Sequence, residues 1–370
     1  MRIVYDARVI DRPSSGLGRF AGELLLALLD SGIRPDVHVD VLVPASADAA
    51  TNRYVRVLRS HVDQGHCALH PVSIPSISVV QQLAIPALVS KLGGDLYFYP
   101  HFDVPSAVPI PFIFVVHDLT PLKVAGYVHR LERLKKRYFK LCVERGLRKS
   151  LHCVAVSQTT KRDLLEEFGA EWEQKIHVSY EGASIDRTDV DPRAVEAMGI
   201  KGAYLLYVGT RRPNKNIKFM LDVFAEMRQR FGYPGELVMA GSTKNFEFDV
   251  DRYAAAIGGV RIVGSVRDDQ LAALYASTES LILLSKYEGF GLPIIEAAYF
   301  GRRMIVSDGG ALKEIAPSSA CVVPLALDAR AAADVALDYL RHTGPHTDLS
   351  NYSEKFSWGR VARSVFEEAY

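Results

Sequence analysis

The stretch LILLSKYEGFGLPIIEAAYF, residues 281–300, reads as a strand, a glycine turn and a helix in that order. Residues 281–284 are apolar without a break, which predicts a buried parallel strand. Gly289 and Gly291 supply a backbone that bends freely, and Pro293 suits the first turn of a helix. Because the N–H groups at the start of a helix favour an anion, we expect an anion-binding turn at the end of a parallel strand.

Two carboxylates flank this turn. Glu288 follows the strand and Glu296 stands eight residues later, about one turn into the helix. Carboxylates accept hydrogen bonds from hydroxyl groups such as those of sugars and riboses. The pattern favours an elongated ligand with an anionic part and hydroxyl groups. The alternative is an ordinary glycine-rich turn with two solvated glutamates.

The same alternation of strand and helix runs along the whole chain. Short β-branched or apolar runs predict strands at 3–5, 37–43, 113–116 and 153–156, and again at 204–208, 236–240, 260–263, 281–284 and 304–306. A polar stretch at 184–201 separates the two sets, so we place a domain boundary there. The sequence therefore predicts an α/β protein with two doubly wound parallel sheets, in domains 1–185 and 186–355, whose strand ends line a cleft.

Composition excludes several classes of protein. The 370 residues carry 44 Lys and Arg against 43 Asp and Glu, and this balance argues against a nucleic-acid partner. The four cysteines show neither zinc-ligand spacing nor a disulfide pattern. The N-terminus lacks the apolar run of a signal peptide, and no apolar stretch is long enough to span a membrane. We expect a cytoplasmic protein with a small-molecule partner.

A second candidate motif is Gly209-Thr-Arg-Arg-Pro-Asn-Lys215, directly after the predicted strand 204–208. Its three cations, Arg211, Arg212 and Lys215, suit a diphosphate whose negative charge grows as its bond to a sugar breaks. The alternative is a basic surface turn.

Two further candidates lie in the first domain. His117 follows the apolar run 112–116, and a histidine at the end of a strand points toward a ligand-binding edge more often than one inside an apolar face; a structural histidine is the alternative. Gly16 and Gly18 suggest a dinucleotide-binding fingerprint, but they begin about ten residues after the first strand, whereas that fingerprint follows its strand at once. The alternative for this segment is a plain helix-entry loop.

Glu288 to Glu296 resembles the E-x7-E motif of retaining glycosyltransferases of the GT-B fold, in particular the family called GT4. Stretches similar to that family occur in the same order at 6–20, 116–122, 156–169, 207–216 and 264–301. The resemblance implies that Glu296 binds the ribose of a nucleotide and that Glu288 lies at the transferred sugar. The backbone of Gly289, Phe290, Gly291 and Leu292 is then expected to contact the sugar and phosphates.

The resemblance also implies roles for the other motifs. Arg211 and Lys215 match the cation pair that holds the diphosphate beside Gly209, although Thr210 departs from the pattern and leaves Arg211 or Arg212 for this role. Gly16 and Gly18 are expected near the terminal phosphate or sugar, His117 at the donor sugar, and the backbone around Val266 at the base. The resemblance is not to the other common transferase fold, which uses a metal-binding D-x-D motif, so neither a metal nor a cofactor is expected.

The implied activity is transfer of a hexose from a nucleotide diphosphate sugar to a hydroxyl of a glycan or lipid-linked acceptor, in polysaccharide or glycolipid synthesis. The N-terminal domain is the expected acceptor side and the C-terminal domain the nucleotide-sugar side. GDP-mannose is the first expectation for the donor and a UDP-sugar the second. A nucleotide-sugar epimerase of the same architecture and an inactive sugar-nucleotide-binding protein remain as alternatives.

Residues 130–149 contain nine basic and two acidic residues and predict an amphipathic helix with an apolar stripe of Leu131, Leu134, Tyr138 and Leu141. This stripe either packs on the sheet or lies on an anionic membrane, where the enzyme would be peripheral on the inner face. By analogy with the family, residues 356–370 form a helix that crosses back to the N-terminal domain.

Overall fold

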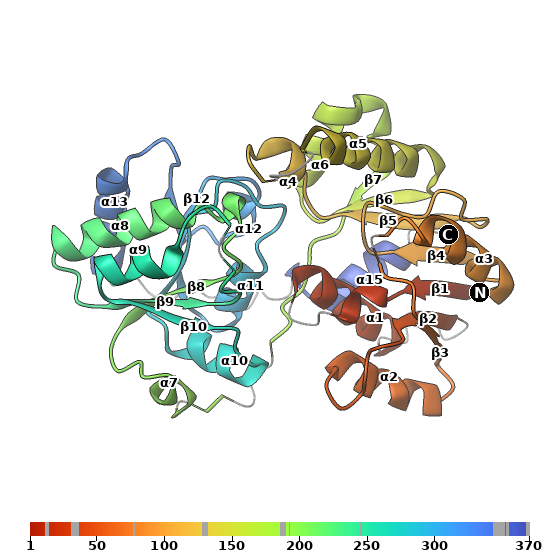
Figure 1. Ribbon diagram of the computed structural model, residues 1–370, viewed down its shortest axis with the longest axis horizontal. Helices are drawn as coiled ribbons and strands as arrows, with labels where there is room; N and C mark the ends of the chain where they lie inside the picture. The colour runs from red at the N-terminus through yellow and green to blue at the C-terminus, as the bar shows by residue number, and fades with distance from the viewer. Residues whose placement is uncertain are drawn as a thin grey trace. The chain divides into compact units, whose positions relative to one another are not determined.

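The computed structural model describes residues 1–11, 15–30, 37–76, 78–127, 132–185, 190–191, 193–244, 246–342, 352 and 355–367. The chain divides into two compact units. The first contains Met1–Leu119, Leu131–Gly182 and Phe356–Tyr370, and the second contains Thr120–Arg130 and Ala183–Lys355. Each unit has its own sheet flanked by helices (Figure 1). The division differs from the sequence-based one, because Thr120–Arg130 groups with the second unit and that unit resumes at Ala183.

The first unit is built on a seven-stranded sheet of order β3-β2-β1-β4-β5-β6-β7, in which every pair of neighbours is parallel. Its strands are β1 (Arg2–Asp6), β2 (His38–Pro44), β3 (Cys67–Val72), β4 (Leu96–Tyr99), β5 (Phe112–Val116), β6 (His152–Ala155) and β7 (Ile176–Val178). The strand order reverses between β1 and β4. In open α/β sheets such a reversal leaves a crevice at the carboxyl ends of the two strands, where ligands bind.

Helices cover both faces of this sheet. They are α1 (Gly16–Asp30), α2 (Arg53–Asp63), α3 (Gln81–Leu92), α5 (Glu132–Lys149), α6 (Gln158–Phe168) and α15 (Trp358–Glu367), with 3-10 turns η1 (Arg8–Asp11) and η2 (Ala170–Trp172). The C-terminal helix α15 packs on α1 within this unit. Its Phe366 ring lies 5.2 Å from that of Phe98 in β4, and its Trp358 ring lies 5.7 Å from that of Phe20 in α1.

The second unit is built on a six-stranded parallel sheet of order β10-β9-β8-β11-β12-β13. Its strands are β8 (Tyr204–Val208), β9 (Glu236–Ala240), β10 (Val260–Gly264), β11 (Ser280–Leu283), β12 (Arg303–Ser307) and β13 (Cys321–Val323). Its helices are α4 (Thr120–Lys123), α7 (Arg193–Ala197), η3 (Pro213–Lys215), α8 (Ile217–Gln229), α9 (Val250–Ile257), α10 (Asp268–Ser277), α11 (Leu292–Tyr299), α12 (Leu312–Ile315) and α13 (Ala329–Arg341). Here the strand order reverses between β8 and β11.

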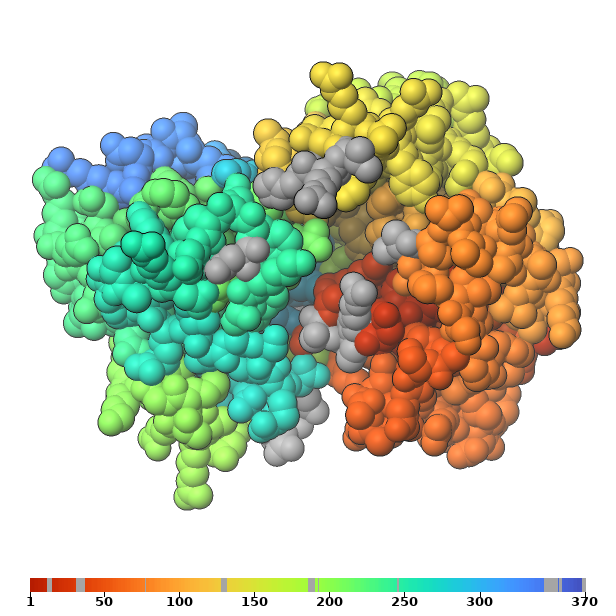
Figure 2. All heavy atoms as spheres, viewed as in Figure 1, coloured from red at the N-terminus to blue at the C-terminus, as the bar shows by residue number. Residues whose placement is uncertain are grey.

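Helix α5 turns a different face to the sheet from the one that the sequence suggests. Leu134, Tyr138 and Leu141 of the predicted stripe are 60%, 44% and 54% exposed. The face that packs on β5 and β6 consists of Phe139, Cys142, Val143, Gly146 and Leu147. Gly146 allows this approach, because a Cβ at that position would lie 2.7 Å from the ring of Phe114. Figure 2 shows the segment in yellow at the surface of the first unit.

No helix in the described ranges is long and apolar enough to cross a bilayer. The four cysteines are all buried and none forms a disulfide. Burial raises the pKa of Cys67 and of Cys321 to about 11, so these groups are neutral thiols near pH 7.

Candidate functional site

The loops that follow β8 and β11 are hydrogen-bonded to each other in the second unit. The backbone N–H of Lys286 donates to the Asn214 carbonyl at 2.7 Å, and the Asn214 side chain donates to the Tyr287 carbonyl at 3.2 Å. Asn216 donates to the Leu284 carbonyl at 3.1 Å. Since β8 and β11 are neighbours at the point where the strand order reverses, these contacts fix both loops at the edge where such sheets bind ligands.

Lys215 and Glu288 form an ion pair at this edge. The Lys215 Nζ lies 2.6 Å from the Glu288 Oε2, and the two side chains are 16% and 10% exposed. Ser285 Oγ donates to the other carboxylate oxygen, Oε1, at 2.6 Å. Both oxygens of Glu288 are therefore held, while the Lys215 ammonium has three N–H donors to distribute.

The backbone of Glu288 is also fixed by a neighbouring glycine pair. The Ala311 N–H donates to the Glu288 carbonyl at 2.9 Å. A Cβ at Gly310 would lie 2.3 Å from that carbonyl oxygen, and a Cβ at Gly309 would lie 2.3 Å from the Ser285 carbonyl oxygen. Only residues without side chains permit this close approach, so the packing against the turn between Ser285 and Glu288 requires glycine at both positions.

Helix α11 begins directly after this turn, as the sequence predicts. Gly291 has a φ of 106° and precedes the first helical residue, Leu292, with Pro293 in the first turn. Gly289 and Phe290 connect Glu288 to this start, and Phe290 is buried. The backbone N–H groups of the first turn and the positive end of the helix dipole follow Glu288 by four residues, and such a helix start suits an anion.

Glu296 lies in the second turn of α11 and is 3% exposed. The Tyr275 hydroxyl of α10 donates to its Oε2 at 2.7 Å. The ring of Tyr275 stacks on that of Phe300 with centroids 5.9 Å apart, which holds the tyrosine in place. Of the two glutamates of the motif, Glu288 lies in the turn and Glu296 lies in the helix that follows it, and both are buried.

The three cations of the loop after β8 have different partners. The Arg211 guanidinium, which is buried, donates to Asp251 Oδ2 at 2.7 Å and to the Thr243 carbonyl at 3.1 Å. Arg212 donates to the Tyr127 hydroxyl at 2.8 Å and lies over the rings of Tyr127 and Phe246. In this structure Lys215 contacts Glu288, Arg211 is oriented by Asp251, and Arg212 lies against aromatic rings.

The backbone at the end of β8 is closely packed. Gly209 approaches Gly241 at the end of β9 so closely that a Cβ on Gly241 would lie 2.1 Å from the Gly209 oxygen. The Tyr207 hydroxyl donates to the Thr210 carbonyl at 2.6 Å. Burial, with the nearby charge of Glu288, raises the pKa of Tyr207 well above its usual range, so it stays a neutral donor. Val266 follows β10 at the same end of the sheet and is half-buried.

The remaining candidates lie in the first unit. Gly16 starts α1, and the Ser15 hydroxyl accepts from the Gly18 N–H at 3.0 Å, as a helix cap does. His117 follows β5, with its ring 4.7 Å from that of Phe20 in α1. The structure therefore brings α1 and His117 together. It also shows that β1 ends at Asp6 and that η1 follows it, so the glycines do not form a dinucleotide turn.

His117 has a carboxylate partner that no sequence signal revealed. Its Nδ1 lies 3.3 Å from Glu181 Oε1, and its Nε2 lies 2.9 Å from the Pro100 carbonyl oxygen. Burial alone lowers the pKa of His117, but the hydrogen bond and charge of Glu181, with help from the Pro100 carbonyl, outweigh it and raise the pKa. Glu181 is far in the sequence from its partner His117, and Asp251 is far from its partner Arg211. Ser285 stands only three residues before Glu288, so that spacing could have suggested their contact.

Two family descriptions match the two halves of the chain. Residues 14–187 match "Glycosyltransferase Family 4", and residues 193–356 match "Glycosyl transferases group 1". The chain belongs to the family 4 glycosyltransferases. This family 4 enzyme is 24% identical over 338 residues to the O-antigen chain mannosyltransferase B of Escherichia coli, an alignment that covers 85% of this chain and 84% of the relative.

Solved structures show the same fold. The glycosyltransferase superposes on the sucrose-phosphate synthase of Thermosynechococcus elongatus with a TM-score of 0.74 at 18% identity, covering 100% of this chain and 98% of that one. It superposes on the Anabaena protein HepE, solved in complex with UDP-glucose, with a TM-score of 0.71 at 15% identity, covering 100% and 99% of the two chains. The predictions of a GT-B fold and of a glycosyltransferase are confirmed.

Proposed function

We propose that this glycosyltransferase moves mannose from GDP-mannose to a hydroxyl of a growing polysaccharide or lipid-linked glycan, with retention of the anomeric configuration. The observation that carries the proposal is the contact of Lys215 with Glu288 at the start of α11, at the strand reversal of the second sheet. The printed name of the Escherichia coli relative, an O-antigen chain mannosyltransferase, supports mannose as the sugar and a polysaccharide as the acceptor.

The proposed chemistry uses the charges at this edge. As the bond from the anomeric carbon to the diphosphate oxygen breaks, negative charge grows on the leaving phosphate. Lys215 donates to that phosphate while it keeps its contact with Glu288, and the N–H groups of 289–292 bind the other oxygens. Glu288 accepts hydrogen bonds from the transferred sugar, and Glu296 accepts them from the ribose.

The acceptor reacts on the same face of the sugar. Its hydroxyl oxygen forms the new bond to the anomeric carbon, and its proton passes to the departing phosphate oxygen, so no protein base is needed. Charge stabilisation by Lys215 and Arg211 takes the place that a metal ion has in other transferases, and the proposal includes no metal and no cofactor.

A donor panel tests this proposal. The purified full chain is incubated with GDP-mannose, UDP-glucose or ADP-glucose, each with octyl α-mannoside as acceptor and in the presence of EDTA. We expect transfer from GDP-mannose and an α-linked product by NMR. If only UDP-glucose supports transfer, the donor is UDP-glucose and not GDP-mannose. An isomerised donor without acceptor would identify an epimerase, and binding without transfer or hydrolysis would identify a binding protein.

We also propose that the first unit binds anionic membranes through α5, on the inner face of the cell membrane. Its exposed apolar residues Leu134, Tyr138 and Leu141 lie on one stripe of a helix with eight basic and two acidic residues. Arg133, Lys135 and Arg137 form no ion pair with any residue that the structure describes. A helix with apolar side chains and surplus positive charge suits an anionic lipid surface.

A second exposed apolar group adjoins this stripe. Arg145 stands four residues after Leu141, on the same side of α5. Its guanidinium lies 3.5 Å from the side-chain oxygen of Gln82, at the start of α3. Beside Gln82, the side chains of Val79, Val80 and Leu83 are 87%, 62% and 80% exposed. The two groups together form the proposed membrane-binding surface of the first unit.

A further inference from the structure

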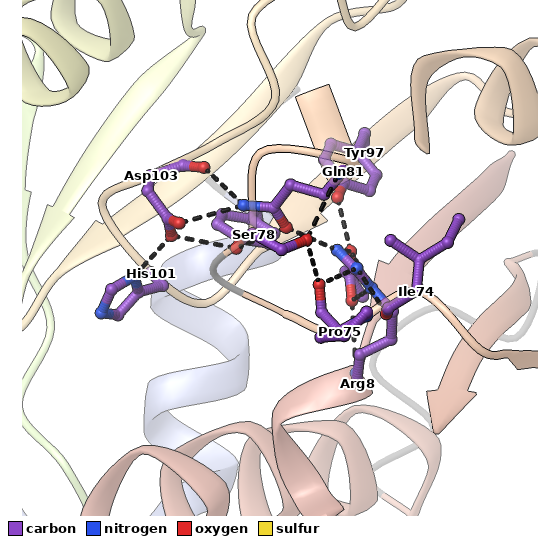
Figure 3. Close-up of polar contacts among 10 residues, drawn as sticks. Arg8, Ile74, Pro75, Ser78, Gln81, Tyr97, His101 and Asp103 are labelled. Atoms are coloured by element: carbon purple, nitrogen blue, oxygen red, sulfur yellow. Dashed lines mark hydrogen bonds and ion pairs between the residues drawn. The ribbon is translucent and has the colours of Figure 1, made fainter. Parts of the chain in front are cut away.

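A buried polar network fills the strand reversal of the first sheet, between β1 and β4 (Figure 3). Arg8, just after β1, pairs with Asp6 at 2.7 Å, and each side chain is 1% exposed. The Tyr97 hydroxyl of β4 donates to the same carboxylate at 2.6 Å. The charges of Asp6 and Arg8 compensate each other, so the ligand chemistry of this edge depends on the groups that lie further along the network.

Gln81 of α3 connects this pair to a second carboxylate. Arg8 donates to the Gln81 side-chain oxygen at 3.0 Å, and the Gln81 amide donates to Asp103 Oδ2 at 3.0 Å. The Tyr99 hydroxyl of β4 donates to Asp103 Oδ1 at 3.0 Å. Burial raises the pKa of Asp103, but hydrogen bonds from His101 and Tyr99 outweigh it, and the net pKa lies below the usual range. Asp103 is therefore an ionised carboxylate inside the protein.

The network ends at His101, the member that reaches solvent. Its Nδ1 lies 2.6 Å from Asp103 Oδ1, and its side chain is 16% exposed whereas that of Asp103 is 0% exposed. Because the carboxylate is ionised, the proton of this contact lies on Nδ1. In the part of the chain that the structure describes, the other nitrogen, Nε2, has no hydrogen-bond partner. Figure 3 shows the ring at one end of the chain of contacts.

His101 is also linked through aromatic contacts to the buried face of α5. Its ring lies 4.3 Å from that of Phe102, which in turn lies 4.5 Å from that of Phe139 in α5. Pro100, the residue before it, accepts the hydrogen bond of His117. The histidine thus stands at the carboxyl edge of the first sheet, just after β4, and the α5 residue that it approaches through Phe102 belongs to the buried face of that helix.

We propose that His101 binds a sugar hydroxyl of the glycan acceptor through Nε2, and that Asp103 is the positioning residue that orients its ring. The inference rests on the proposed function, in which the second unit binds the nucleotide sugar and the first unit receives the acceptor. In this arrangement His101 sets where the acceptor glycan lies in the first unit.

The charge of the network favours a neutral ligand over an anion. The charges of Asp6 and Arg8 cancel each other, so the uncompensated charge of the network is that of Asp103. A phosphate at His101 would face this carboxylate directly behind the ring. A hydroxyl both donates and accepts a hydrogen bond, and it therefore suits Nε2 as an acceptor in neutral imidazole or as a donor in imidazolium. A carboxylate that fixes the far nitrogen of a histidine is a common way to orient the near one toward a substrate.

Steady-state kinetics of the full chain with GDP-mannose and octyl α-mannoside test the proposal. The His101→Ala change removes one hydrogen bond and is expected to raise the acceptor KM about five- to tenfold. The donor KM and the slow hydrolysis of donor without acceptor stay within twofold. His101→Gln keeps a polar group near the Nε2 position, so its acceptor KM lies between those of the wild-type protein and His101→Ala. Asp103→Asn raises the acceptor KM less than His101→Ala does.

His70→Ala is the matched control. His70 contacts the buried Asp40 at 2.7 Å in the same unit, so this variant removes an equivalent pair away from the strand reversal. We expect its acceptor KM to stay at the wild-type value. An unchanged acceptor KM in active His101→Ala, or an equal rise in the donor KM, would overturn the proposal.

An NMR titration separates this proposal from the proposed function. The His101 ring signal, identified by its loss in His101→Gln, is followed as octyl α-mannoside is added. A shift that saturates supports the site, and no shift overturns it. If no nucleotide sugar is transferred or hydrolysed by the wild-type chain while the shift persists, the proposed function fails and the sugar site at His101 stands.

Discussion

Lys215 and Glu288 are 73 positions apart in the chain, and their charged atoms lie 2.6 Å from each other. They meet because β8 and β11 are neighbours in the sheet although β9 and β10 lie between them in the sequence. The cation follows the first of these strands and the carboxylate follows the second. An ion pair so placed, with Ser285 on its other side, is preorganised for a ligand that carries both a diphosphate and hydroxyl groups.

Removing either partner of this pair is expected to abolish most of the activity. Lys215→Ala and Glu288→Ala each lower kcat roughly 100- to 1,000-fold, because each removes a preorganised charge at the reacting bond. Initial rates of product formation measure the loss. Lys218→Ala is the control, since Lys218 lies on the following helix, is paired with Asp222 and is exposed. Wild-type rates in both site variants would contradict the account.

The contact between the ends of β8 and β9 predicts a specific loss of stability. Gly241→Ala places a Cβ 2.1 Å from the Gly209 oxygen at a φ of +124°. We expect a cost of about 3 kcal/mol or more in the free energy of unfolding, from overpacking and backbone strain together. Gly258→Ala shares the positive φ but meets no atom within 4 Å, and it should cost only about 1 kcal/mol. Equal melting temperatures for the two variants would contradict this packing.

Five of the six strands of the second sheet could be predicted because of their composition, and only the three-residue β13 was missed. The run at 204–208 is continuous and apolar, the run at 236–240 is apolar after Glu236, and the structure begins and ends β8 and β9 at the same residues. Three strands of the first sheet were not predicted. β3 contains His70 and Pro71 and β4 is a short aromatic run, so neither shows the β-branched pattern on which the prediction depends, and β7 has only three residues, which is too short for a pattern to be recognised.

At α5 the periodicity of apolar residues predicted the helix but not the face that packs on the sheet. Two stripes at helical spacing exist on this helix, and apolar spacing does not say which one faces the sheet. The signal that decides is Gly146, which lets the buried face approach Phe114, while Leu134 and Leu141 remain exposed. A glycine inside an otherwise good helical pattern is therefore informative about which side packs closely.

The candidate site was predictable as far as it is local. Glu288, Gly291 and Pro293 form one continuous motif, and their geometry follows from strand, turn and helix rules. The partners Asp251 and Glu181 come from other elements, and only the sheet order brings them to Arg211 and His117. A single sequence without structure does not contain that order.

The Glu181 contact predicts how His117 titrates. Because its folded pKa is raised, His117 contributes stability that is fully present below about pH 6.5 and is lost as the pH rises through the folded pKa. Glu181→Gln removes the charge, so the pKa of His117 falls and the variant loses stability at about pH 6 but not at about pH 9. NMR titration of the His117 ring and melting temperatures at the two pH values measure this.

Glu144→Gln, which removes the exposed partner of Arg148 in the same unit, is the control for this titration. It should leave the His117 midpoint unchanged. The same midpoint in Glu181→Gln as in the wild-type protein would show that Glu181 does not hold the proton of His117.

Exposure of the α5 stripe predicts binding to anionic vesicles. The wild-type chain should sediment with vesicles of phosphatidylglycerol and phosphatidylcholine but not with phosphatidylcholine alone, and added salt should weaken binding. Replacing Leu134, Tyr138 and Leu141 by Ser should lower the affinity about tenfold or more. Val57→Ser with Val62→Ser, on α2, removes other exposed apolar groups and should have no effect. Equal binding by both variants would exclude α5 as the membrane surface.

The most direct test of the central claim compares a nucleoside diphosphate with its monophosphate by calorimetry. If the site around Lys215 and Glu288 holds the terminal phosphate, the wild-type protein binds GDP at least about tenfold more tightly than GMP, and Lys215→Ala removes most of that preference while GMP affinity changes little. A GDP preference that is as large in Lys215→Ala as in the wild-type protein would contradict the account.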